Sequence, residues 1–168
     1  QLYRGVAPEC SFYVAKALST NGSGWTSDIV AGIEALVMRQ VHVINLSLGS
    51  DGPSDGRDAL SFACDAAVDR GVVVCVAAGN AGPNGGTIGA PGTARKVITV
   101  GASDKADQIA LFSSRGPTAD ARVKPDVLLP GVAIVSCRAI GTTMGAPVND
   151  LYTSASGTSM STPHATGV

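Results

Sequence analysis

The apolar residues of this chain fall into short runs separated by two segments with helical spacing. The first helix is predicted after Gly24, with Thr26 or Ser27 as its cap, because a hydroxyl there can accept a bond from a free N–H group of the first turn. Its apolar residues recur at i, i+4, i+7 and i+8, which places them on one face: Ile29, Ile33, Leu36 and Val37. A second helix is expected to start at Ser54 or Asp55 and to end near Arg70, before Gly71.

Four apolar runs around these helices predict strands. The run over 72–77 is uninterrupted, which is typical of a central parallel strand covered on both faces. An alternation of strands and helices favours right-handed crossovers and a parallel sheet. Beyond Gly101 the pattern changes to short strands and turns. The predicted fold class is therefore α/β, with strands over residues 12–18, 41–48, 72–77 and 97–100.

Composition narrows the class of protein further. The 168 residues are 45% apolar and 15% charged, which excludes a disordered chain and fits one domain over residues 1–168. The net charge is −1 without a basic run, so nothing indicates nucleic acid or an anionic membrane as a partner. No apolar stretch reaches the roughly 18 residues that a membrane span needs.

The four cysteines, at positions 10, 64, 75 and 137, form no Cys-x-x-Cys pair and indicate no metal site. Cys64 and Cys75 lie within apolar stretches, where a free cysteine behaves as a small hydrophobic residue. We favour this interpretation over a disulfide framework, which small secreted domains need more than a chain of this length.

The first candidate for chemistry is the glycine-rich loop that follows the 72–77 run. Ligands of open α/β sheets bind beyond the carboxyl ends of the strands, where Asn80 would lie. A nucleotide-binding loop is disfavoured, because the spacing is not Gly-x-Gly-x-x-Gly, Pro83 interrupts it and no helix opens at the last glycine. Taken alone, Asn80 also fits a turn former.

The second candidate is the hydroxyl-rich segment 156–164. Thr158 is expected to cap a helix, which places Ser159 beside free N–H groups and the positive end of the helix dipole. That position suits a nucleophile whose product is an oxyanion. The segment is not the Gly-x-Ser-x-Gly elbow of α/β-hydrolases, because position 161 is Ser.

Together these segments resemble the subtilisin-like serine proteases (subtilases) over nearly the whole chain. The resemblance implies a three-layer fold with a mostly parallel twisted sheet, incomplete at both ends, and an acyl-enzyme mechanism. It also implies that Ser159 is the nucleophile, while Asn80 and the Ser159 N–H are the oxyanion donors. The matching blocks are Gly-Val-Ala-Pro (5–8), Val-Ile-Asn-Leu-Ser-Leu-Gly (43–49), Val-Ala-Ala-Gly-Asn (76–80), Phe-Ser-Ser-Arg-Gly-Pro (112–117), Lys-Pro-Asp-Val (124–127) and Gly-Thr-Ser-Met-Ser-Thr-Pro-His (157–164).

The same resemblance implies where a peptide or protein substrate would bind. One segment would pair with the extended substrate as an added strand, a second would form the opposite rim, and a third would line the pocket for the side chain before the cut. The small residues of that pocket favour a broad apolar preference. The implied substrate-binding residues are Ser47, Leu48 and Gly49; Ser23 and Gly24; and Ala77, Ala78 and Gly79.

A serine nucleophile needs a base and an orienting acid, and neither is recognisable in this sequence. Subtilases supply them in Asp-x-Gly and His-Gly-Thr-His motifs upstream of the Gly-Val-Ala-Pro block. Here the only histidines are His42, in a predicted strand, and His164, whose side chain would face away from Ser159 on a helix. We therefore expect an internal piece of a secreted endopeptidase, inactive without the N-terminal part of its catalytic domain. The alternative is a non-catalytic relative or scaffold.

No cofactor is implied for the chemistry, but structural calcium is common in subtilases. Asp126 and the backbone near Gly92, Ala94 and Val97 match a weak cation site of some members. One carboxylate is little for an ion that takes six to eight oxygen ligands, and Asp126 also fits a capping acid. The resemblance further implies a cis bond at Ala90–Pro91.

Overall fold

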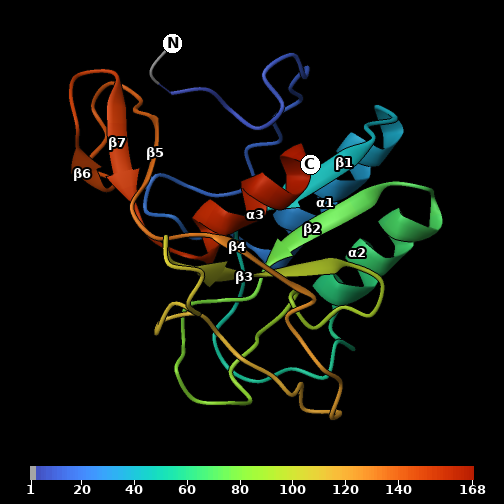
Figure 1. The fold of residues 1–168 in the computed structure, drawn as a ribbon. Coiled ribbons are helices and arrows are strands. Elements are labelled where there is room, and N and C mark those ends of the chain that lie inside the picture. The colour runs from blue at the N-terminus through green and yellow to red at the C-terminus, as the bar shows by residue number, and fades with distance from the viewer. Residues whose placement is uncertain (1–2) are drawn as a thin grey trace.

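Four parallel strands form the main sheet, in the order β1-β2-β3-β4. The computed structural model describes residues 3–168 (Figure 1). In β2 and β3 only the first residue is exposed, which explains why these two strands are almost wholly apolar or small. The predicted parallel sheet is thus confirmed, with strands that differ by a few residues from the predicted runs: β1 (Val43–Leu46), β2 (Val73–Ala77), β3 (Ile98–Ser103) and β4 (Val127–Pro130).

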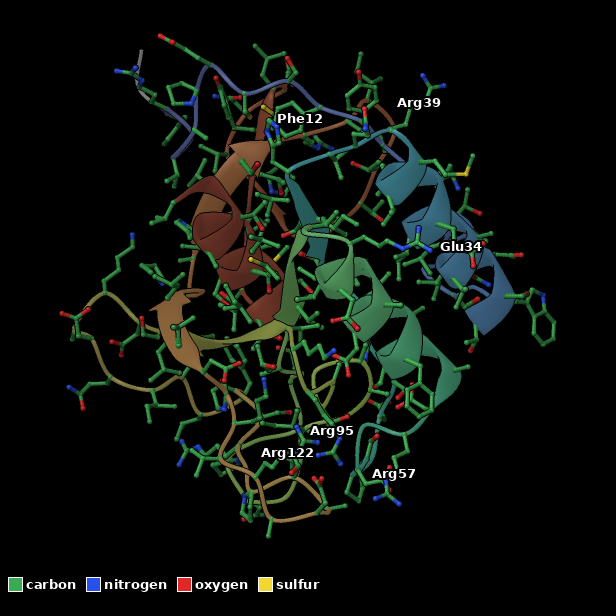
Figure 2. The ribbon with its side chains drawn as sticks, turned by 90° about the vertical axis from the view of Figure 1, so that its right-hand side faces the viewer. Phe12, Glu34, Arg39, Arg57, Arg95 and Arg122 are labelled. Carbon is green, nitrogen blue, oxygen red and sulfur yellow. The ribbon has the colours of Figure 1, made fainter. Side chains whose placement is uncertain are left out.

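Helices cover both faces of this sheet. Figure 2 shows α1 (Thr26–Met38) and α2 (Ala59–Asp69) on one side, with α3 (Thr158–Gly167) on the other. Side chains alternate along β2, so Val74 and Val76 pack against the α1–α2 layer in the main hydrophobic cluster. No helix within residues 3–168 has the length and apolar character to cross a membrane.

The predicted cap of the first helix is wrong by one or two residues. The chain is extended at Trp25, which is the N-cap residue and makes no side-chain cap bond. Thr26 is already helical, so the hydroxyls of Thr26 and Ser27 fall inside the first turn. The predicted apolar face is confirmed, since Ile29 and Ile33 are buried in the main cluster.

The second helix begins later than its sequence suggested. Asp58 is the cap, and its Oδ1 accepts a hydrogen bond of 2.9 Å from Ser61 N. Ser54 and Asp55 instead shape the turn before the helix, where Ser54 Oγ donates to Asp58 Oδ2 at 3.2 Å. The end of the helix is as predicted, at Arg70.

The strand predicted over residues 12–18 does not form. A strand needs the N–H and C=O groups of a neighbour, and no strand of the described chain pairs with this segment. The segment lies along α1, where Ala15 and Ala17 approach Gly32. Ala17 and Leu18 pack against the edge of the main cluster, whereas the earlier apolar side chains stay in solvent, and Phe12 is 83% exposed (Figure 2). Apolar composition without a partner was therefore a misleading signal.

A second, antiparallel sheet stands beside the main one, in the order β5-β7-β6 (Figure 1). It accounts for the short strands expected after Gly101, and β7 leads into α3 through Gly157. Its strands are β5 (Ile134–Cys137), β6 (Ala146–Pro147) and β7 (Tyr152–Ala155).

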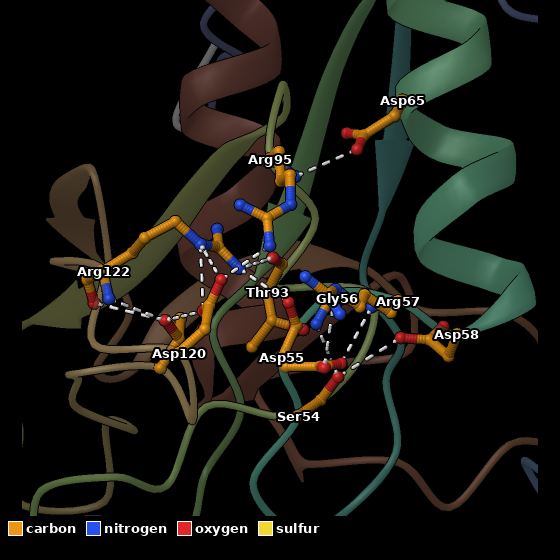
Figure 3. Close-up of polar contacts among 11 residues, drawn as sticks. Ser54, Asp55, Gly56, Arg57, Asp58, Asp65, Thr93, Arg95, Asp120 and Arg122 are labelled. Atoms are coloured by element: carbon orange, nitrogen blue, oxygen red, sulfur yellow. Dashed lines mark hydrogen bonds and ion pairs between the residues drawn. The ribbon is translucent and has the colours of Figure 1, made fainter.

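A cluster of charged side chains connects three loops, which contain Asp55, Thr93 and Arg122 (Figure 3). Arg122 Nη2 donates to Asp55 O at 3.0 Å and to Thr93 O at 2.7 Å. Its Nε and the guanidinium of Arg95 both bond Asp120. The bond from Arg122, and next to it the bond from the Thr118 hydroxyl, hold the pKa of the Asp120 carboxyl well below its usual range. The cluster fixes the loop between β2 and β3, whose residues 91–94 are buried.

All four cysteines are free, as expected, and they differ in exposure. Burial raises the pKa of the Cys64 thiol to about 12, with a smaller contribution from the charge of Asp65. Burial also raises the pKa of Cys75, whereas Cys10 and Cys137 are exposed.

We predict that a thiol reagent at about pH 8 alkylates Cys10 and Cys137 in the native protein and spares Cys64 and Cys75, because the thiolate is the reactive form. Mass-spectrometric mapping of the alkylated peptides measures this, and denatured protein serves as the control in which all four react. Modification of Cys64 as fast as Cys137 without unfolding would contradict the prediction.

Candidate active site

Asn80 follows the carboxyl end of β2, where its side chain meets the start of α3. Its Oδ1 accepts two hydrogen bonds, from Thr158 N at 2.9 Å and from Thr158 Oγ1 at 3.1 Å. Asn80 is exposed, and within residues 3–168 its Nδ2 has no acceptor. The amide is therefore oriented through its oxygen, and its two N–H donors remain for a ligand.

Thr158 is not the helix cap that its sequence predicted. Gly157 is the N-cap of α3, and Thr158 is its first helical residue, fully buried. Its hydroxyl accepts from Gly79 N at 3.2 Å and donates to Asn80 Oδ1. The hydroxyl therefore bonds the loop after β2, whereas a capping hydroxyl would bond an N–H group in the first turn of its own helix. Gly79 has φ +105° and a Cβ there would lie 2.8 Å from Ser114 Oγ, so the loop requires glycine at this position.

Ser159 occupies the first turn of α3 and faces the end of β1. Its Oγ donates to Ser47 O at 3.2 Å, while Ser47 Oγ donates to Ser159 O at 2.9 Å. Pro163 explains the second bond, because proline has no N–H to donate to the carbonyl four residues earlier, which is that of Ser159. Ser47 supplies the missing donor and thereby fixes the backbone of Ser159 against the sheet.

One cleft joins most of the residues that the resemblance singled out. It opens between the carboxyl ends of β1 and β2 and the start of α3. The sequence reasoning missed its Ser50, Asp51, Gly89 and Ala90, which lie in the two loops of the rim. The cis bond at Ala90–Pro91 marks this turn, and Ala90 O accepts from Ser50 N at 2.8 Å. The full lining is Leu48, Gly49, Ser50, Asp51, Ala77, Ala78, Gly79, Asn80, Gly89, Ala90, Thr158 and Ser159.

Ser23 and Gly24 do not line this cleft. They belong to the turn before α1, where Ser23 Oγ donates to Asn21 Oδ1 at 2.6 Å. Gly24 packs against the backbone of Ala17, and a Cβ there would clash with the Ala17 carbonyl oxygen. The turn residues of this segment thus satisfy one another, and the role of Ser23 and Gly24 as the opposite rim of the binding site stays a prediction.

Neither histidine is placed as a base for Ser159. His164 Nδ1 lies 2.9 Å from Met160 O within the same helix. His42 precedes β1 whereas Ser47 follows it, and five extended residues span about 16 Å. Within residues 3–168, no group of three or more His, Cys, Asp or Glu side chains gathers as a metal site.

Comparisons with known proteins identify the family of this chain. A family model described as "Subtilase family" matches residues 2–168. The chain is 40% identical over 188 residues to serine protease AprX of Bacillus subtilis (strain 168), covering 99% of this chain and 42% of AprX. It is 44% identical over 165 residues to subtilisin DY of Bacillus licheniformis, covering 97% and 54%. The solved structure of sphericase superposes with a TM-score of 0.76 at 31% identity, covering 95% and 53%. The chain thus spans about half the length of these relatives.

Proposed function

Because this chain belongs to the subtilase family, we propose that it carries the nucleophile and the oxyanion donors of a serine endopeptidase. The observation that carries the proposal is the pair of hydrogen bonds from Thr158 to Asn80 Oδ1, which leave the Asn80 N–H donors beside the first turn of α3. Oxyanion stabilisation needs donors already oriented toward the site where charge develops.

In the proposed reaction, Ser159 Oγ attacks the carbonyl carbon of the scissile peptide bond. Its proton passes to a base, the carbonyl electron pair moves to oxygen, and Asn80 Nδ2 and Ser159 N stabilise the oxyanion. Collapse expels the amine, which takes the proton, and water then hydrolyses the acyl-enzyme. We place the base and its acid in another part of the protein, because neither His42 nor His164 reaches Ser159.

The proposed substrate is an extended peptide that pairs with Ser47, Leu48 and Gly49 as an added strand. The side chain before the cut would enter beside Ala77, Ala78 and Gly79, whose small size supports a broad apolar preference. An extracellular site of action, which the resemblance implies, remains part of the proposal.

We predict that residues 1–168 alone hydrolyse a chromogenic peptide no faster than their Ser159→Ala variant, because no base is placed on the serine. The full-length protein should show serine-dependent turnover in the same assay. Matching rates for the isolated chain and the full-length protein would contradict the first expectation. A full-length protein without serine-dependent turnover would instead favour a non-catalytic scaffold.

A further inference from the structure

Lys124 brings a positive charge into the interior of the protein. Its side chain is 5% exposed, a rare state for lysine unless its ammonium is paired. The Nζ atom donates to Val97 O at 3.0 Å and to Asp126 Oδ2 at 2.6 Å. The ammonium therefore joins the residue just before β3 to the residue just before β4.

The oxygens around this ammonium are those that the resemblance assigns to a weak cation site. Besides Val97 O and Asp126, that set includes Gly92 O, which accepts a bond of 2.6 Å from the buried hydroxyl of Thr99. Asp126 Oδ2 also accepts from Thr99 N at 2.7 Å. The Lys124 ammonium lies where a cation would contact Val97 O and Asp126, so these residues do not fit a metal ion while the lysine is present.

We propose that the Lys124 ammonium is a built-in cation at this position, and that its removal would create a binding site for a hard cation such as Ca²⁺. A tethered ammonium neutralises Asp126 and satisfies Val97 O without an ion from solution. Carbonyl and carboxylate oxygens are also the ligands that Ca²⁺ prefers, so the vacated space keeps the chemistry that Ca²⁺ recognises.

The use of the Lys124 ammonium in place of a dissolved cation has a consequence for the cleft. In the loop that ends at Val97, the buried residues 91–94 directly follow the rim residue Ala90. Lys124 Nζ bonds Val97 O at the end of that loop. Arg122 Nη2 bonds Thr93 O within the loop (Figure 3). The rim is thus held at this point without a dissolved ion.

The test compares thermal unfolding of the full-length protein and its Lys124→Ala variant with EDTA and with CaCl₂ on the order of 10 mM, which exceeds the dissociation constants of weak calcium sites. In EDTA the variant should melt about 3–10 °C below the wild type, because Asp126 loses its positively charged partner and Val97 O loses its donor. Calcium should restore most of this loss, a gain beyond any calcium response of the wild type. Exposed Lys105→Ala is the matched control and should respond as the wild type does.

Two further variants keep the test decisive. Lys124→Ala combined with Asp126→Asn should lose the calcium gain, because the one carboxylate of the new site is gone. Asp126→Asn alone should leave the calcium response of the wild type unchanged, and this arm does not require Lys124→Ala to fold. Loss of the wild-type calcium response in Asp126→Asn would overturn the proposal, and so would a folded Lys124→Ala variant with no calcium gain.

Discussion

Replacing Ser159 by alanine in the full-length protein is expected to lower kcat by about 10⁶-fold and to leave KM nearly unchanged. The loss is large because the proposed acyl-enzyme cannot form without the Oγ atom, while the cleft that we propose for the peptide stays intact. The magnitude is the one known for the nucleophile of subtilisin, a member of the same family, and is carried over from it. Initial rates on a chromogenic peptide, at several substrate concentrations, measure both constants.

The matched control for this variant is Ser136→Ala, which removes an exposed hydroxyl from β5. It should keep wild-type kinetics. Circular dichroism should show that both variants remain folded, since Ser159 Oγ makes one hydrogen bond, to Ser47 O. A Ser159→Ala variant within about tenfold of wild-type kcat would exclude this serine as the nucleophile.

Replacing Asn80 by alanine is expected to lower kcat by about 10²–10³-fold with little change in KM. The Asn80 N–H donors act on negative charge that exists only after attack, so their removal costs more in the transition state than in the bound substrate. The range is again that of the corresponding asparagine in subtilisin. A variant in which only KM rises would contradict the oxyanion role and make Asn80 a substrate-binding residue.

Thr158 provides a graded control for the same claim. Thr158→Val keeps the size of the side chain but removes the hydroxyl that donates to Asn80 Oδ1 at 3.1 Å. Because Thr158 N still holds that oxygen, kcat should fall only about tenfold, the scale of one hydrogen bond. Thr158→Ser retains the hydroxyl and should recover most of the rate, which a role in packing alone would not explain.

The sequence predicted well those parts of the fold in which a short segment determines its own conformation. The run over 72–77 has no polar residue and became the buried strand β2. Gly71 follows the end of α2 with φ +86°, a conformation that glycine adopts without strain. The family and the parallel sheet were predicted correctly because the specific motifs lie at the strand ends and at the start of α3.

Other features depend on partners that sequence spacing does not reveal. Thr158 had the composition of a cap, but its hydroxyl bonds a loop 79 residues earlier. Residues 12–18 had the composition of a strand, but no described strand pairs with them.

The contacts that build the cleft also determine when it can form. Ser159 is 112 residues from Ser47, and Asn80 is 78 residues from Thr158, so the side-chain bonds that join α3 to the two strand ends close long loops. Such contacts form late in folding, because their entropy cost is met only after the intervening chain is ordered. During synthesis, all four strands of the main sheet leave the ribosome before Ser159 does. The serine that we propose as the nucleophile is therefore positioned only after the main sheet and the start of α3 have formed.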